Sequence, residues 1–377
     1  MPRRRIPAAL TAVAAALALL TGCMGGQSYS SSEVTDADAQ RVPLAQLDLL
    51  DDPRDWTGES TAKLASASVD VLIERPEQEL PATVTSHDLT GDTAVTVTET
   101  TRVLGLDMSG SIAATIVGLG FAETLVGRDI SSTFEQVVDL PVVTSSGHSI
   151  NSESIISLRP TLVVTDGSIG PIDVVLQLRD AGIPVVFVDD VAGFEGVGTL
   201  ARQVGAAFGA AEAGEELAGL LEAQIEAKAA EIAEIAPNGD DRLRMLFLYL
   251  RGGSGIYYLF GSESGVDDLI TGIGGIDVAT EIGWTGLQPM TDEAVIAARP
   301  DLILVMTSGL DSTGGIDGLL DEKPALAQTP AGQNRRFVDM ASGQVLGFGP
   351  RTAGVLDALA RAVYAPAPGS QASSVSP

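Results

Sequence analysis

The chain has 377 residues, of which 45% are hydrophobic, so it is long enough for two domains with apolar cores of their own. It carries 50 acidic residues against 22 lysines and arginines, which argues against a protein that holds nucleic acid on a basic surface. One cysteine and two histidines exclude disulfides within the chain and metal sites that need three histidines.

The N-terminus has the pattern of a lipoprotein signal peptide. Arginines at positions 3–5 precede an apolar run over residues 8–20, and a lipobox ends at Cys23. We expect residues 1–22 to be removed and Cys23 to carry a lipid anchor; the alternative is an ordinary secretory signal that ends near a cysteine. Since residues 1–22 contain three of the 22 basic residues and no acid, the mature chain has 19 basic and 50 acidic residues, a net charge of −31.

The first half of the mature chain predicts an α/β lobe. Residues 23–68 are expected to be a flexible tether and an acidic segment whose structure the pattern leaves open. Apolar strands and amphipathic helices then alternate over residues 69–209, the predicted N-terminal lobe. The expected elements are a hairpin within residues 83–97, strands at 102–106, 123–126, 162–164 and 185–188, and helices at 109–119, 172–180 and 200–208.

A long helix separates this lobe from a second one. Residues 211–235 repeat an apolar residue every three to four positions between strong helix formers, and such a helix would be about 38 Å long. We expect residues 210–236 to link the lobes, residues 237–365 to form the C-terminal lobe, and residues 366–377 to be a disordered tail. In the second lobe we expect strands at 245–248 and 302–305 and helices at 266–271 and 353–364.

The two lobes contain matching segments. Residues 152–164 and 292–304 each read as a short helix with an early glutamate, an Arg-Pro turn and an apolar strand. The fold class expected is therefore α/β, with two Rossmann-like lobes joined by a single long helix.

His148 and Tyr249 are the candidate ligand-binding residues. His148 follows an apolar strand segment, and open α/β sheets bind ligands beyond such strand ends; the alternative is a solvated loop histidine. Tyr249 ends a strand in the second lobe, where an aromatic ring usually only packs. Arg251, two residues on, is expected on the same side of the extended chain, where it would favour a phenolate. Imidazole and phenolate both serve as haem ligands, so the two lobes could hold ferric haem between them.

These motifs resemble the haem-binding lipoproteins of ABC importers, of the actinobacterial HmuT kind. The resemblance covers about residues 83–364 and rests on the lipobox, the long helix, the duplicated units and the segment 140–151. It implies a class III (cluster A) periplasmic binding protein in which His148 and Tyr249 hold the haem iron and Arg251 supports the tyrosine. Some relatives have a tyrosine ligand in the first lobe, where this chain has Phe134. Further pocket residues are expected at Phe134, Tyr257, Tyr258, Trp284 and Met306, although each of the last four is as readily a core residue.

The resemblance also implies partners and a location. Glu153 and Glu293 occupy the same register of the two repeats, and we expect them to dock on an ABC permease dimer with its ATPase; the alternative is two solvated acids at helix starts. The protein would be a monomer without catalytic activity, lipid-anchored at the extracytoplasmic face of the membrane. Anionic haem propionates would meet Arg251, Arg128 or Arg351. Alternative functions are a ferric-siderophore or cobalamin binder of the same fold, a haem-using surface enzyme or sensor, and an adhesion or scaffolding lipoprotein.

Overall fold

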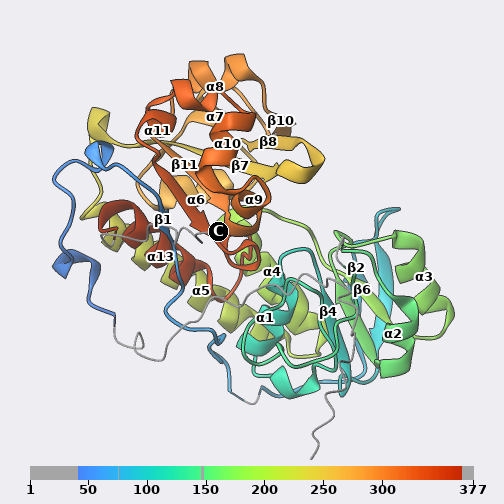
Figure 1. The fold of residues 1–377 in the computed structure, drawn as a ribbon. Helices are drawn as coiled ribbons and strands as arrows, with labels where there is room; N and C mark the ends of the chain where they lie inside the picture. Colours follow the sequence, from blue (N-terminus) through green and yellow to red (C-terminus); the bar gives the residue numbers. More distant parts are fainter. Residues whose placement is uncertain (1–40, 75, 146–147, 367–377) are drawn as a thin grey trace, which may run out of the picture. The chain divides into compact units, whose positions relative to one another are not determined.

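The computed structural model describes residues 41–74, 76–145 and 148–366 (Figure 1). The predicted signal peptide, Cys23, the start of the tether and the tail from residue 367 lie outside the described residues. None of the helices in the described ranges combines the length and the apolarity that a bilayer crossing requires. The fold of these ranges is α/β, as the sequence predicts.

The first parallel sheet has the order β4-β5-β6, formed by Val103–Leu106, Leu162–Thr165 and Val185–Phe187. Every residue of these strands is buried, as is typical of parallel strands covered on both faces. The predicted hairpin is confirmed by the antiparallel pair β2 and β3. These elements and the accompanying helices are β2 (Ala82–Ser86), β3 (Thr93–Val97), α1 (Ser111–Gly118), α2 (Ser152–Leu158), α3 (Ile172–Asp180) and α4 (Gly193–Ala207).

The strand expected at residues 123–126 is wrong. Ala122–Thr124 form the short 3-10 helix η4, and only Leu125 makes a single bridge to Val103 at the edge of β4. Because the 3-10 helix takes up Ala122–Thr124, the segment pairs with β4 at a single residue and does not form a strand.

The second sheet has the order β1-β12-β11-β7-β8-β10, with β9 also paired to β7. Strands β1, β12, β11 and β7 are parallel, whereas β8 and β10 add an antiparallel edge. The strands are β1 (Ser60–Thr61), β7 (Arg244–Arg251), β8 (Ile256–Phe260), β9 (Ile276–Asp277), β10 (Leu287–Pro289), β11 (Leu302–Met306) and β12 (Phe337–Met340). The helices are α6 (Val266–Gly272), α7 (Val278–Glu281), α8 (Asp292–Ala298), α9 (Thr307–Ser312), α10 (Gly315–Glu322), α11 (Pro330–Gln333), α12 (Ser342–Val345) and α13 (Thr352–Tyr364). Short 3-10 helices complete the set: η2 (Leu44–Gln46), η3 (Pro53–Asp55), η5 (Gly239–Asp241), η6 (Gly252–Ser254) and η7 (Leu326–Gln328).

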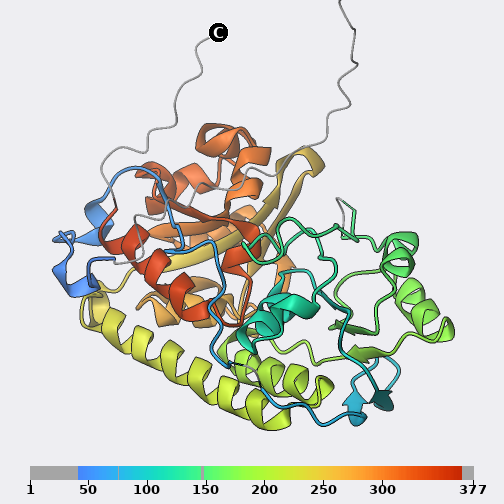
Figure 2. The same ribbon diagram turned by 90° about the horizontal axis from the view of Figure 1, so that it is seen from below.

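The long helix α5 spans Ala211–Ala233, which confirms the helix predicted between the two sheets. It packs against α4 and α13 (Figure 2). The contact with α4 is close because Gly205 and Gly214 face each other: a Cβ added at Gly214 would lie 2.9 Å from the Ala201 carbonyl oxygen. The stripe residues Leu217 and Leu221 are buried, so the amphipathic pattern in the sequence reports real packing.

The acidic N-terminal segment, whose structure the sequence left open, joins the second sheet. Ser60–Thr61 pair in parallel with Val338–Asp339 of β12, and the side chain of Leu44 is fully buried. Arg336 lies beneath this strand without any exposed surface, and its guanidinium donates to the Ser60 hydroxyl and the Val363 carbonyl. From Arg41 onward the segment is thus part of the folded body.

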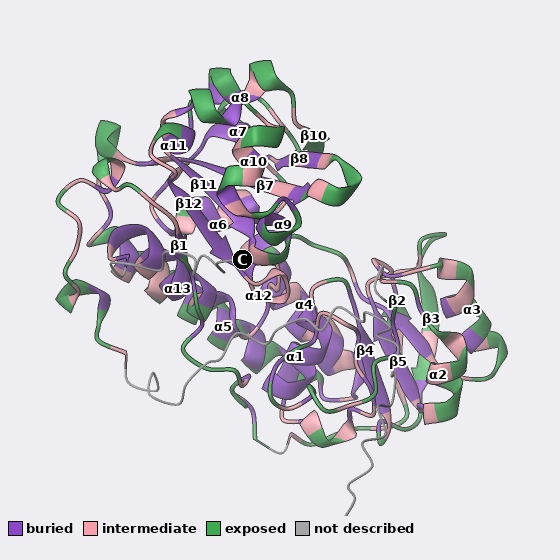
Figure 3. Cartoon of the chain, viewed as in Figure 1, coloured by how far each residue is buried: buried purple, intermediate pink, exposed green. Residues whose placement is uncertain are grey.

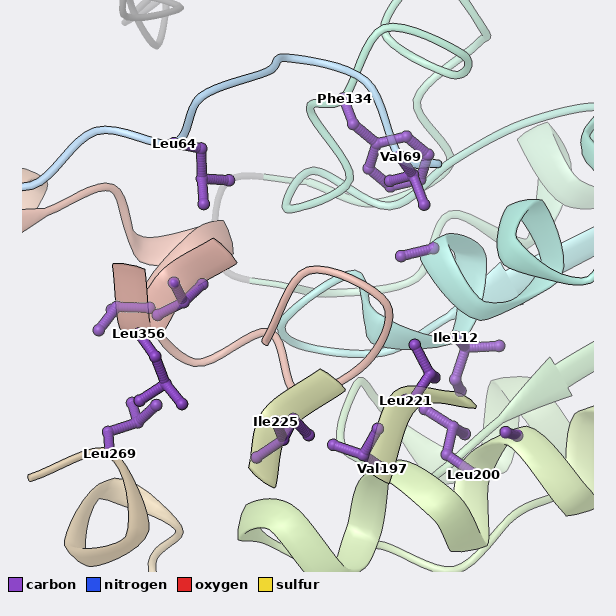
Figure 4. Close-up of a cluster of buried hydrophobic side chains, with 14 of the residues drawn as sticks. Leu64, Val69, Ile112, Phe134, Val197, Leu200, Leu221, Ile225, Leu269 and Leu356 are labelled. Atoms are coloured by element: carbon purple, nitrogen blue, oxygen red, sulfur yellow. The ribbon is translucent and has the colours of Figure 1, made fainter. Parts of the chain in front are cut away.

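A single apolar cluster connects helices from both halves of the described chain (Figures 3 and 4). Figure 4 shows Ile112 of α1 near Leu221 of α5, with Leu356 of α13 in the same cluster. Burial of one such side chain is worth about 1.5–3 kcal/mol. The shared core therefore ties the long helix to both sheets.

The duplicated segments have the same local structure. Helices α2 and α8 each have seven residues, begin with a side-chain cap at Asn151 or Thr291, and end at a left-handed arginine, Arg159 or Arg299. Each arginine precedes a buried proline and then a buried parallel strand, β5 or β11. The repeat read in the sequence is thus a repeat in structure.

Candidate ligand-binding site

Tyr249 and Arg251 lie on the hairpin formed by β7 and β8 (Figure 1). The strand was expected at residues 245–248, whereas β7 begins one residue earlier and ends three residues later, so it includes both Tyr249 and Arg251. Because strand side chains alternate, Tyr249 and Arg251 share a face. The guanidinium carbon of Arg251 lies 5.8 Å from the centre of the Tyr249 ring. Tyr249 is half-buried and Arg251 is exposed, so both can meet a ligand.

Phe260 and Tyr258 surround Tyr249 on the same face of the hairpin. Tyr258 is the direct cross-strand partner of Tyr249, and the ring of Phe260 meets that of Tyr249 edge-on at 6.3 Å. Such edge contacts hold an aromatic ring in one orientation. Met306, at the end of β11, faces the same apolar cluster and is buried. Of the predicted pocket residues, Tyr258 and Met306 share the Tyr249 face.

Tyr257 and Trp284 do not belong to this face, contrary to the predicted pocket. Tyr257 points to the opposite side of the sheet, where its hydroxyl donates to Glu322 and the Lys323 ammonium lies 4.1 Å from its ring centre. Trp284 packs against the same opposite cluster. For Tyr257, alternation along β8 decides this, because neighbouring residues of a strand point in opposite directions.

Phe134 is a core residue rather than a pocket wall. Only 1% of its surface is exposed, and the guanidinium of Arg351 covers its ring, with Cζ 5.3 Å from the ring centre. Arg351 is itself buried and donates to the Gly343 carbonyl at 2.9 Å. Arg128 donates to the carbonyls of Val138 and Asp129. Among the three arginines considered for propionates, Arg251 alone is exposed.

His148 lies in the loop before α2, with an unusual backbone. Its φ is 57°, a left-handed value that few residues other than glycine adopt. Its backbone N–H donates to the Ser145 carbonyl at 3.0 Å. Within the described parts of the chain, its ring nitrogen Nδ1 is buried and has no hydrogen-bond partner. Strain and an unpaired buried nitrogen are features that gather at functional sites.

Charged residues from both sheets act electrostatically on His148. Burial lowers the pKa of its imidazole most, the positive charge of Arg251 lowers it further, and the Asp107 carboxylate raises it. His148 therefore stays neutral at pH 7, and the neutral imidazole is the form that binds metal ions. The charge on the hairpin that carries Tyr249 thus acts on the loop that carries His148.

A hollow of about 170 Å³ lies at the carboxyl ends of β4, β5 and β6, and its wall includes Phe260, whose ring meets that of Tyr249. Its first-sheet side is acidic, with Asp107, Asp166 and Asp190, and its second-sheet side includes Phe260 and Phe348. Sequence reasoning missed Asp107 and Phe260. The signal for Asp107 was its place directly after a buried strand, and the signal for Phe260 was its alternation with Tyr258.

Two aspartates at this edge have strongly shifted pKa values. Burial and then the nearby Asp107 charge raise the pKa of Asp129 and of Asp166 to about 7 each. Backbone N–H groups of Ser131 and Ser132 donate to the Asp129 carboxyl, and Ser168 donates to Asp166. Serine-rich loops hold these acids in place. No group of three or more His, Cys, Asp or Glu side chains suited to a free metal ion occurs in the ranges that the structure describes.

Glu153 and Glu293 are exposed in the first turns of α2 and α8. Neither carboxylate forms an ion pair among the described residues. Both remain available to a partner molecule.

Residues 108–342 match the family of periplasmic binding proteins. A solved structure of the heme binding protein HmuT is 39% identical to this chain, covers 83% of it and 99% of its own length, and superposes with a TM-score of 0.76. Solved alanine variants of HmuT replace a histidine, a tyrosine and an arginine, the last two standing two positions apart.

Two curated relatives are more distant. An uncharacterized ABC transporter substrate-binding lipoprotein, YvrC of Bacillus subtilis, is 26% identical over 74% of this chain and 85% of its own length. A cobalamin-binding protein of Halobacterium salinarum is also 26% identical, over 59% of each chain.

Proposed function

Since this chain belongs to the family of periplasmic binding proteins, we propose that it captures haem outside the cytoplasm and delivers it to an ABC importer. One observation carries the proposal: the charge of Arg251, which lies beside the Tyr249 ring on the same strand face, lowers the pKa of the His148 imidazole. We therefore place the imidazole and the phenol, which come from two different sheets, on the two sides of one ligand space. The likeness to HmuT supports haem as the ligand, because alanine variants of that protein alter the same three residue types, with the same spacing between tyrosine and arginine.

The proposed ligand contacts follow from the chemistry of each side chain. Tyr249 supplies a phenolate oxygen to ferric haem iron, and His148 supplies a neutral imidazole nitrogen. Arg251, beside the Tyr249 ring, favours the phenolate by its charge and is exposed enough to meet a propionate. Tyr258 and Phe260 offer apolar contact to the porphyrin from the same hairpin face.

Capture and release, without catalysis, is the work proposed for this site. Ligation from two sides leaves no open iron position, and oxygen or peroxide chemistry needs one. The strained φ of His148 is an energetic cost that haem binding would offset. A neutral His148 makes the site competent at neutral pH, because its pKa lies below the ordinary value.

Delivery would use the duplicated units. We expect Glu153 and Glu293, exposed at equivalent helix starts, to form ion pairs with basic groups on the two halves of a permease dimer that works with its ATPase. The lipobox supports a lipid anchor on Cys23, and the protein would act as a monomer at the extracytoplasmic face of the membrane.

Cobalamin or a ferric siderophore is the alternative ligand. The similarity to a cobalamin-binding protein favours this alternative, although that similarity covers only 59% of each chain. With such a ligand, His148 and Tyr249 would be packing residues or minor contacts, and the spectrum of added haem would not change.

A visible absorption titration tests the proposal. Soluble protein from residue 24 is titrated with ferric haem beside His148→Ala and Tyr249→Ala. We expect a saturating one-to-one shift of the Soret band, with an altered spectrum and affinity weakened about tenfold or more, about 1.4 kcal/mol, in each variant. An effect of Tyr249→Ala alone would keep haem but remove His148 from the site. An unshifted wild-type spectrum would sink the haem proposal, and cobalamin and ferric siderophores would be tested next.

A further inference from the structure

Helices α2 and α8 expose an isoleucine at the same register of the duplicated unit. Ile156 is 51% exposed and Ile296 is 41% exposed. Each follows a fully buried neighbour, Ile155 or Val295, which already supplies the helix with its core contact. The exposed isoleucines therefore do not contribute to the core of either half.

The match includes three exposed positions on each helix, and both helices carry exposed residues in Figure 3. Ile156 stands three residues after Glu153, and Ile296 three residues after Glu293, so acid and isoleucine are neighbours on one helix face. A small residue follows each isoleucine, Ser157 or Ala297, and is also exposed. We call this acid-isoleucine-small surface the docking face of each helix.

Both docking faces lie toward the edge of their sheet at which the carboxyl ends of the parallel strands meet. Each helix ends at an arginine whose backbone is in the left-handed conformation, and a parallel strand, β5 or β11, follows. A helix that leads into a parallel strand runs back along the sheet, so its first turn lies toward the carboxyl ends of the strands. The α2 face follows His148 by only a few residues in the chain.

We infer that Ile156 and Ile296 are apolar anchors that insert into the two halves of the permease dimer, each beside the ion pair of its glutamate. The inference rests on the proposed function. Two copies of one face fit a partner that is itself two-fold symmetric. Under this inference, each half of the permease would offer a basic group to the glutamate and an apolar pocket to the isoleucine. Side chains that dominate the binding energy of an interface fill well-packed pockets from which water is excluded.

Charge complementarity favours this partner over the other surfaces that an exposed isoleucine could meet. The two glutamates have no ion-pair partner in the described ranges, so their charges favour a partner that has basic groups. An anionic lipid surface would repel them, and so would a second copy of a chain with a net charge of −28 before processing.

Binding of the haem-loaded chain to the haem permease and ATPase of the same organism, held in lipid nanodiscs, tests the inference. The variants are Ile156→Ser, Ile296→Ser and the double substitution, with Leu220→Ser as the matched control because Leu220 is 39% exposed on α5, outside the repeat. We expect each single variant to bind about tenfold more weakly, about 1.4 kcal/mol. The double variant should bind about a hundredfold more weakly, since distant sites add. The control should bind like wild type.

The outcomes separate this inference from the proposed function. Haem absorption and thermal unfolding should be unchanged in all variants, because both isoleucines are exposed and neither belongs to a buried apolar cluster of the described residues. If the double variant binds the permease as tightly as wild type while Glu153→Ala binds weakly, the inference that the isoleucines are anchors is overturned. The proposed delivery of haem would remain intact. A wild-type chain that binds haem but not the permease would overturn the docking faces altogether. Self-association that the double variant abolishes would also overturn the inference, since the faces would then bind a second copy.

Discussion

Asp129 shows how single residues at the edge of the first sheet are held in unusual states. Its carboxyl group is completely buried, and burial together with the Asp107 charge raises its pKa to about 7. In the unfolded chain an aspartate has a pKa of about 3.9. Between these two values the folded protein keeps a proton on Asp129 that the unfolded chain has lost, so protonation stabilises the fold.

The stability that Asp129 contributes should therefore depend on pH near neutrality. A raised folded pKa means that the contribution is fully present below about pH 4 and is lost as the pH rises through about 7. We expect Asp129→Asn, which stays neutral, to gain free energy of unfolding relative to wild type from pH 5 to pH 8. Urea unfolding at several pH values measures this, with the exposed Asp139→Asn as control. A wild-type-to-variant difference that does not change with pH would contradict the raised pKa.

At the scale of elements, the packing of α4 on α5 depends on missing side chains. Gly205 and Gly214 let the two helix backbones approach so closely that a Cβ at Gly214 would meet backbone atoms of Ala201, Gly205 and Arg202 within 3.2 Å. Glycine lowers the intrinsic stability of a helix. At Gly214 the gain in packing outweighs that cost, whereas Gly219 of the same helix has nothing within 4 Å of an added Cβ.

The same substitution at these two glycines should have opposite effects. Gly219→Ala should raise the free energy of unfolding by about 0.5–1 kcal/mol, because alanine is the better helix former and the site is open. Gly214→Ala should lower it by about 1–3 kcal/mol, since backbone rather than a flexible side chain would have to move. Chemical denaturation of both variants checks this pair. Equal stabilisation would show that α4 and α5 are not in close contact.

For the whole molecule, the acid excess works against the proposed ligand. The mature chain would have a net charge of −31, with 50 acidic residues and 19 basic ones after loss of the three arginines in residues 1–22. Haem propionates are anions, so the long-range field of the protein repels haem. Within the site, the exposed Arg251 is the local cation.

Haem association should consequently become faster as salt is added. Raising NaCl from about 10 mM to about 0.5 M shortens the Debye length from about 30 Å to a few ångströms and screens the repulsion. Stopped-flow mixing of ferric haem with the protein measures the rate constant, and Arg251→Gln reports the local attraction by its lower rate at all salt concentrations. A rate that falls with salt in wild type would mean that local cations govern the encounter.

Much of the secondary structure could be predicted from patterns among neighbouring residues of the sequence. The 3.6-residue stripe of Leu217 and Leu221 marked α5, and runs of buried apolar residues marked β5 and β11, because helix and strand periods are properties of neighbouring residues. The duplicated Glu-helix and Arg-Pro turn were visible for the same reason. The two-residue spacing of Tyr249 and Arg251 was enough to place both on one strand face.

Contacts between distant segments were decided only by the tertiary structure. Three such interactions are the action of the Arg251 charge on His148, the burial of Phe134 under Arg351 and the pairing of Ser60–Thr61 with β12. Each joins residues about a hundred or more positions apart, and no local pattern in the sequence indicates it. The side of the sheet taken by Tyr257 depended on the register of β8 against β7. Periodicity reports which residues share a face; only packing of the whole chain determines what that face meets.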